Sequence, residues 1–403
     1  MKHNSPSGRL VWSTLAAQCS EQIALAAGPI VVVLALGGNA TDTGFLQMIQ
    51  TLPFLLLSLP VGVLVDRVSR KGLMMWSEVL RASTLCAIVL ALAYSALDVP
   101  LLAILGFLGA IGTLALSVAS PALLSTITEP AQLPTVNRWL ELARSAAFVA
   151  GPPLGGALVG WSGAQVAFLA AMSASFCAVV LIRQIDEPKF VPRPRRHFWH
   201  EMVEGYEFVV RDQFLLPIGA TAMVFNMGWF LLQSVFVVFM IEHLGAAPET
   251  IGMTFGLYGV GMIAGALAAK PLSRMLPLGV LIVIGPLGGF LGANLILASL
   301  VIPNLAPVAL GLFFFGCGPI LWTINTTTLR QIITPAAMQG RVSAVLTLVT
   351  AGARPIGAGL GILIASTAGV EACLAASAIF FSLQLVTIVA SAPARLRHLP
   401  LPA

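Results

Sequence analysis

The sequence predicts an all-α polytopic membrane protein in which twelve transmembrane helices form two pseudo-symmetric halves of six. The chain of 403 residues is 58% hydrophobic and 9% charged, with a mean hydropathy of +0.95, whereas a soluble domain carries about 25% charged residues. Apolar segments recur along the whole chain, each close to the roughly 20 residues that a helix needs to cross a bilayer. Several phrases of the first half return about half a chain length later, which indicates an internal repeat.

Helical spans are expected because lipid offers unpaired backbone groups no hydrogen-bonding partner. The apolar segments predict spans at 10–36, 43–65, 72–96, 99–126, 135–160, 163–185, 214–241, 249–269, 278–301, 305–329, 341–366 and 370–391. The first segment is too long for a signal peptide, and we interpret it as a retained span.

The longest polar stretch, 186–213, separates the sixth predicted span from the seventh. We therefore expect an N-terminal bundle at 1–185, a cytoplasmic linker at 186–213 and a C-terminal bundle at 214–403. Prolines favour an extended start to the linker. From His200 on, apolar residues recur at helical spacing, which predicts an amphipathic helix on the inner membrane face.

Basic and acidic residues lie in different sets of alternating loops. Basic residues such as Arg67, Lys189 and Lys270 fall on the side that also holds both termini. The opposite loops hold no lysine or arginine, and their acidic residues are Asp42, Asp98, Glu242, Glu249 and Glu371. The positive-inside rule makes the basic side cytoplasmic. Because the bases lie in short loops between spans, the net charge of +5 does not indicate nucleic-acid binding.

Other classes of function find little support. All five cysteines lie inside apolar segments without the spacing of a disulfide framework or a zinc site. The chain has no Walker lysine motif, and its spans carry no nucleophile–base pair. We expect no cofactor, no metal and no enzymatic activity.

The loop between the second and third spans, at 62–71, reads GVLVDRVSRK. A weaker echo at 265–274, GALAAKPLSR, has Ala269 in place of the acid, and further echoes pair Pro130 with Pro335 and Pro152 with Pro355. Duplicated six-span halves suit a transporter that rocks around a site between them.

On these residues the chain resembles a major facilitator superfamily transporter, whose signature for this loop is Gly-x-Leu-x-Asp-Arg-x-Gly-Arg-Lys/Arg. Ser69 replaces the second glycine, and the matching residues are Gly62, Leu64, Asp66, Arg67, Arg70 and Lys71. The resemblance implies a conformational latch in which Asp66 accepts hydrogen bonds at a helix N-terminus of the other half, where the dipole favours an anion. The alternative is a basic loop that serves topology alone. Because the echo lacks the acid, we expect a latch in the N-terminal half only.

The fifth span contains GPPLGG at 151–156. Gly151, Pro152, Gly155 and Gly156 resemble the core of a motif that marks proton-coupled antiporters of this superfamily, although Ala147 stands where an upstream glycine is expected. The motif favours export. Simple close packing of helices is the alternative, since small residues let neighbours approach.

Phrases at 121–138, 204–212 and 328–342 resemble a branch of drug and siderophore exporters that includes macrolide efflux proteins and the enterobactin exporter. This resemblance implies a monomeric, proton-coupled antiporter that exports amphipathic small molecules by alternating access. It also implies a location in the bacterial inner (plasma) membrane. An importer or a lipid-handling transporter of the same fold is the alternative.

Ionisable residues inside spans are costly and usually functional. Glu21 lies near the predicted midplane and shares a helical face with Gln18 and Gln22. Loss of hydration raises the pKa of a carboxyl group, as proton uptake within a membrane requires. Glu21 is therefore the first candidate for proton or cation coupling, unless an arginine of another span holds it in a purely structural role.

The remaining candidates are paired or isolated. Glu78 with Arg81 and Glu141 with Arg144 are spaced i,i+3 and favour salt bridges. Arg354 has no acid in its own span, so it is expected to pair with Glu21 or Glu141 across the halves or to meet an anionic substrate group. Two further cavity candidates share a face of the seventh span, Asn226 and Gln233.

Overall fold

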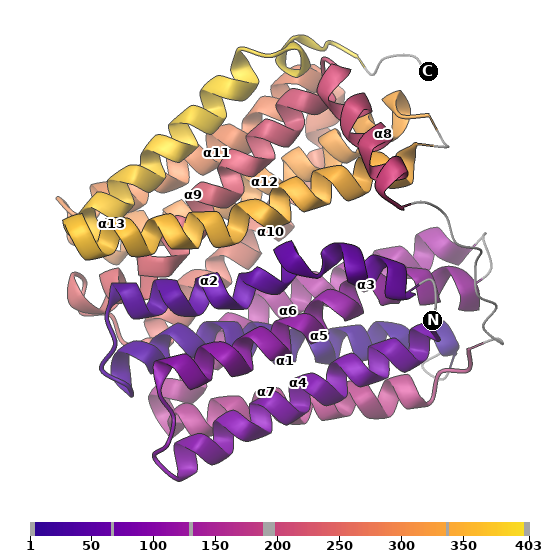
Figure 1. The fold of residues 1–403 in the computed structure, drawn as a ribbon. Helices are drawn as coiled ribbons and strands as arrows, with labels where there is room; N and C mark the ends of the chain where they lie inside the picture. The colour runs from indigo at the N-terminus through magenta and orange to yellow at the C-terminus, as the bar shows by residue number, and fades with distance from the viewer. Residues whose placement is uncertain (1–4, 66–67, 129–131, 188–197, 336–337, 399–403) are drawn as a thin grey trace. The chain divides into compact units, whose positions relative to one another are not determined.

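The computed structural model describes residues 5–65, 68–128, 132–187, 198–335 and 338–398. Within these ranges every regular element is helical (Figure 1), as the sequence predicts. The N-terminal half contributes α1 (Pro6–Leu34), α2 (Ala40–Leu56), α3 (Ser58–Val65), α4 (Arg70–Ala93), α5 (Val99–Ile127), α6 (Leu133–Ser162) and α7 (Ala164–Arg183).

The rest of the chain begins with α8 (Phe198–Arg211) and continues with α9 (Leu215–Glu242), α10 (Pro248–Met275), α11 (Leu278–Ala298), α12 (Leu305–Ile333) and α13 (Gln339–Val389), before a short 3₁₀ turn, η2 (Ala392–Arg395). Helix α8 lies where the amphipathic linker helix is predicted. It buries Gly205 and Val209, whereas Val203, Tyr206 and Val210 are exposed. Its buried side packs on α13. The exposed apolar residues form a second strip that the described protein does not cover.

Acidic residues of the predicted outer loops cap the N-termini of helices. Asp42 and Asn39 form a reciprocal capping box at the start of α2. Asp98 accepts from the Leu101 amide at the start of α5. The side chains thus satisfy amides that have no partner within the helix. Capping gives these carboxylates a local role in addition to the charge sorting.

Ten helices in the described part of the chain are long and apolar enough to cross a membrane, whereas the sequence predicts twelve spans. The difference arises at two places. The segment predicted as one span at 43–65 is divided at Leu57 into α2 and α3, both too short to count. The last two predicted spans run together as α13, which has non-helical backbone at Gly369. With these two places considered, the helices are consistent with twelve spans.

The contacts group the chain into two units. Unit 1 comprises Met1–Pro194 and Gly245–Gly256, and unit 2 comprises Arg195–Leu244 and Leu257–Ala403. The first turns of α10 therefore group with unit 1. The boundaries predicted from the sequence, with a linker at 186–213, stay a prediction.

Corresponding spans pack alike within the two units. In unit 1, α1 packs on α6 and α7, and α4 packs on α5. In unit 2, α9 packs on the two spans of α13, and α11 packs on α12. Under a six-span repeat, α9 corresponds to α1 and α11 to α4, so the packing repeats together with the order of the spans.

The turns repeat as well. Gly163, between α6 and α7, has φ of 87°, and Gly369, between the two spans of α13, has φ of 85°. Gly37 after α1 and Gly245 after α9 form a second pair, with φ of 64° and 60°. Glycine adopts these angles without the steric cost that other residues meet. The internal duplication is thus visible in the backbone.

Candidate functional site

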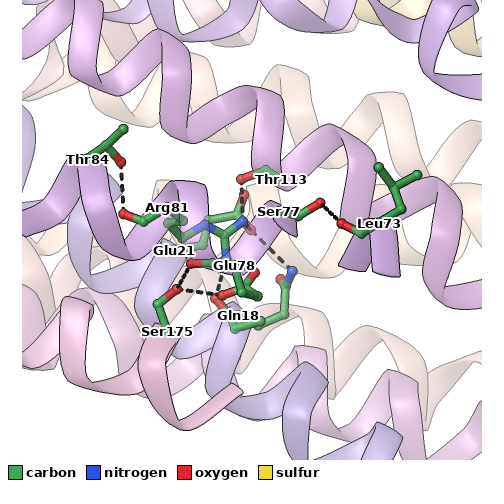
Figure 2. Close-up of polar contacts among 10 residues, drawn as sticks. Gln18, Glu21, Leu73, Ser77, Glu78, Arg81, Thr84, Thr113 and Ser175 are labelled. Carbon is green, nitrogen blue, oxygen red and sulfur yellow. Dashed lines mark hydrogen bonds and ion pairs between the residues drawn. The ribbon is translucent and has the colours of Figure 1, made fainter. Parts of the chain in front are cut away.

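A cluster of charged and polar side chains lies inside unit 1 (Figure 2), around the guanidinium of Arg81 on α4. One guanidinium nitrogen, Nη1, donates to Glu78 Oε1 at 2.9 Å and to the Ala17 carbonyl of α1 at 3.0 Å. The other, Nη2, donates to the Thr113 hydroxyl of α5 at 2.6 Å and lies 3.9 Å from Glu21 Oε2. Arg81 is 4% exposed. It therefore joins α1, α4 and α5 at one buried point.

Glu78 is the most enclosed member of the cluster, with no exposed surface. Arg81 bonds one of its carboxylate oxygens, and the hydroxyl of Ser175 on α7 donates to the other at 2.6 Å. A buried ion pair is sustained only when additional hydrogen bonds satisfy its remaining atoms. Ser175, itself fully buried, supplies such a bond. Glu78 is thus held as a fully satisfied carboxylate.

Glu21 lies farther from Arg81 than Glu78 does. Its side chain is 18% exposed, it accepts from Gln18 Nε2 at 3.2 Å, and its 3.9 Å distance to Arg81 is near the limit of an ion pair. The sequence-based alternative, an arginine from another span beside Glu21, is therefore present in Arg81. Two carboxylates, Glu21 and Glu78, face this one guanidinium.

Gln22 has a different environment from its predicted partners Gln18 and Glu21. It is 6% exposed and lies against Gly151 of α6, where a Cβ atom would collide with its side chain. A Cβ on Gly155 would come within 2.9 Å of the Ile23 carbonyl of α1. The antiporter-like motif thus lets α6 approach α1 beside the charged cluster.

The other face of the motif meets the first turns of α10, which belong to unit 1. A Cβ on Gly156 would come within 2.9 Å of Gly252 Cα, and one on Gly252 would come within 2.5 Å of the Pro152 carbonyl. The motif glycines therefore serve close packing. Their role in antiport stays a prediction.

Both predicted i,i+3 pairs form. In contrast to the buried Glu78–Arg81 pair, Arg144 Nη1 meets Glu141 Oε1 at 2.7 Å with side chains 34% and 68% exposed. Burial therefore distinguishes two pairs that look alike in the sequence.

In unit 2, the candidates of α9 and α13 have local contacts. Asn226 donates to the Ala222 carbonyl of its own helix at 2.8 Å, and Gln233 is half-buried. The guanidinium carbon of Arg354 lies 5.7 Å from the centre of the Phe230 ring, within the range of a cation–π contact. The predicted pairing of Arg354 with a carboxylate of the other half stays a prediction.

An aromatic cluster in unit 2 was not anticipated. Trp229 lies 5.3 Å from Tyr258 and 5.0 Å from Phe315 between ring centres. Phe381 lies 4.8 Å from Phe315 and 5.5 Å from Phe225. Phe315 and Phe381 are fully buried, whereas the other three rings are half-buried. The i,i+4 spacing of Phe225 and Trp229 is the one signal in the sequence; the other rings come from α10, α12 and α13.

The signature loop is described in part. Asp66 and Arg67 lie outside the described residues, so the predicted latch of Asp66 stays a prediction. A Cβ on Gly62 would meet no described atom within 4 Å. Arg70 Nη1 donates to the Thr126 hydroxyl of α5 at 2.7 Å. The amides of Arg70 and Lys71 donate to Glu187, a residue that the sequence analysis did not single out.

Comparison with known families decides the class of this protein. A family model described as Major Facilitator Superfamily matches residues 10–358. The chain belongs to this superfamily. It is therefore a transporter and a multi-pass membrane protein, and the resemblance stated from the signature loop is confirmed.

Relatives in the superfamily include exporters. The chain is 27% identical to the multidrug efflux pump Tap of Mycolicibacterium fortuitum over 97% of its own length and 96% of that protein. It is 26% identical to the enterobactin exporter EntS of Escherichia coli O1:K1 / APEC over 77% and 74% of the two chains. A bacterial homologue of the iron transporter ferroportin, solved in an inward-facing state, shares the fold with a TM-score of 0.77, at 17% identity over 96% and 98% of the chains.

Proposed function

We propose that the protein is a proton-coupled exporter of amphipathic small molecules, such as drugs or siderophores, that works by alternating access. We place it in the bacterial inner membrane with both termini in the cytoplasm. The observation that carries the proposal is Glu21, a partly exposed carboxylate beside an arginine that a second carboxylate already binds.

The exposure and the hydrogen bonds of the two carboxylates distinguish their roles in this proposal. Arg81 and Ser175 bond both oxygens of the fully buried Glu78. The side chain of Glu21 is 18% exposed, which gives a proton access to its carboxylate. An ionisable residue within a membrane span is costly and usually functional, and Glu21 is the proposed proton-binding group.

Release of the proton changes the partners of Arg81. When Glu21 is neutral, the charge of Arg81 is attracted by Glu78 but not by Glu21. When Glu21 is ionised, Arg81 is attracted to both, which draws α1 and α4 together at their buried contact. Protonation thus alters the attraction between two helices of unit 1, as coupling of proton flow to a conformational change requires.

The relatives and unit 2 support the class of substrate. The two named relatives are a multidrug efflux pump and an enterobactin exporter. The half-buried rings of Trp229 and Tyr258 offer aromatic surface to the apolar part of an amphipathic molecule. Arg354, over Phe230, offers a positive charge to a polar group.

The test begins with a screen of dyes and drugs in an efflux-deficient host and continues with one exported compound in proteoliposomes. We expect an imposed proton gradient to drive transport by the wild-type protein, and we expect Glu21→Gln to abolish this response while folding is retained. Glu371→Gln removes an exposed carboxylate and should transport like the wild type. Gradient-driven export by Glu21→Gln at the wild-type rate contradicts the coupling role, and net import in oriented vesicles contradicts export.

A further inference from the structure

The start of helix α4 is capped by a residue more than a hundred positions away. Glu187, which follows α7, accepts hydrogen bonds from the amides of Arg70 at 3.0 Å and Lys71 at 3.3 Å. The third amide of α4, that of Gly72, donates to the Ser69 hydroxyl at 2.9 Å. The first amides of a helix have no partner within it. Here Glu187 and Ser69 together satisfy all three.

The two capping residues also bind each other, because the Ser69 hydroxyl donates to Glu187 Oε2. Ser69 stands where the superfamily signature has glycine. A glycine at this position has no hydroxyl, so it would neither accept from Gly72 nor donate to Glu187. The hydroxyl that Ser69 places at this glycine position therefore has an acceptor, the Glu187 carboxylate.

The residues before Glu187 are also fixed to unit 1. The Gln184 carbonyl accepts from Arg9 of α1 at 2.5 Å. Ile185 is fully buried in the apolar core that includes Leu10 of α1 and Ala178 of α7. The residues directly before the predicted linker are thus packed into the N-terminal unit, and Glu187 is the last described residue before α8.

Helix α4 connects this cap to the charged cluster. Arg70 binds Glu187 through its amide and Thr126 of α5 through its side chain. Glu78 and Arg81 lie further along the same helix. Because a helix is stiff over such a length, whatever holds its N-terminus also sets the position of Arg81.

We propose that Ser69 and Glu187 form a clasp that fastens the linker to α4, and that they act as positioning residues in the transport cycle. The clasp holds the N-terminus of the helix that carries Arg81. The capping part stands on the hydrogen bonds alone, whereas the transport part rests on the proposed function above.

The first test measures hydrogen exchange of the Arg70 and Lys71 amides by mass spectrometry. We expect Ser69→Gly and Glu187→Ala each to speed exchange by about fivefold, since a helix start loses its cap. Asp186→Ala is the matched control, because Asp186 is an exposed carboxylate next to Glu187. Ser69→Thr keeps the hydroxyl and should exchange like the wild type. Unchanged exchange in both clasp variants overturns the proposal.

The second test measures export rates in proteoliposomes per amount of folded protein. We expect each clasp variant to lower the maximal rate several-fold at an unchanged half-saturating concentration, and the double variant to be no slower than the slower single one. Additive slowing, equal slowing in Asp186→Ala, or a normal rate despite faster exchange overturns the transport role. If the wild type itself does not respond to a proton gradient, the proposed function fails while the exchange result still judges the clasp.

Discussion

The two units share a plan and differ in what they bury. Helices α1 and α4 of unit 1 enclose Glu21, Glu78 and Arg81. The corresponding helices of unit 2, α9 and α11, carry aromatic rings and small residues instead: Trp229 packs among rings, and Gly285 and Pro286 are buried in α11.

This difference shows what duplication permits. Equivalent pairs of helices pack together in each unit, and the turns use equivalent glycines. This arrangement of helices therefore forms both around charged side chains and around aromatic rings. Charge in one unit and rings in the other favour a division of work, in which unit 1 handles the proton and unit 2 contacts the apolar part of the substrate.

The largest expected effect is at Arg81. Arg81→Ala removes the guanidinium that pairs with the fully buried Glu78, and we expect the free energy of unfolding to fall by about 3–5 kcal/mol. Arg144→Ala breaks a similar i,i+3 pair that is largely exposed, and it should cost less than about 1 kcal/mol. Chemical denaturation in detergent measures both. Equal costs would mean that the interior of unit 1 does not depend on its charge.

The turn glycines test the shared plan. Gly163→Ala and Gly369→Ala each force a side chain into backbone that glycine alone adopts readily, and we expect each to cost about 1–3 kcal/mol of stability. Gly109→Ala is the control, because a Cβ there makes only an ordinary contact with Thr84 at 3.4 Å. Thermal unfolding of the three variants provides the comparison. A large cost at one turn alone would argue against equivalent turns.

The smallest effect is expected at Trp229. Loss of its ring contacts in Trp229→Ala should weaken the apparent affinity for an aromatic substrate by roughly fivefold, or about 1 kcal/mol. The number of protons exchanged per substrate should stay the same, and Trp229→Phe should retain most of the affinity. Concentration-dependent transport with a pH-sensitive dye measures both quantities. A changed proton ratio would remove the proposed division between the units.

Much of the fold was predictable because lipid imposes a simple rule on composition. The spans of α1 and α9 are visible as apolar runs, and the linker helix α8 appears at its predicted place. The break at Leu57 was not predicted, whereas the interruption of α13 at Gly369 lies between the last two predicted spans. Apolar runs report where a chain enters a membrane, but they do not report where its helical hydrogen bonds are interrupted.

The candidate site was predictable in its members but not in its arrangement. An ionisable residue in a span is conspicuous, so Glu21 and both i,i+3 pairs were found. Ser175 and Thr113 resemble any other small polar residue of a span, and Glu187 resembles any other linker charge. They gain meaning from contacts with residues distant in the sequence.

The sequence by itself determined that this is a membrane transporter of twelve predicted spans with a duplicated plan, because hydropathy, charge sorting and the loop signature are local properties. Only the tertiary structure decided which carboxylate Arg81 bonds closely, which one lies near the limit of an ion pair, and which groups the Ser69 hydroxyl bonds. These are distances between helices, and hydrogen bonds and ion pairs act over a few ångströms in space, whatever the separation along the chain.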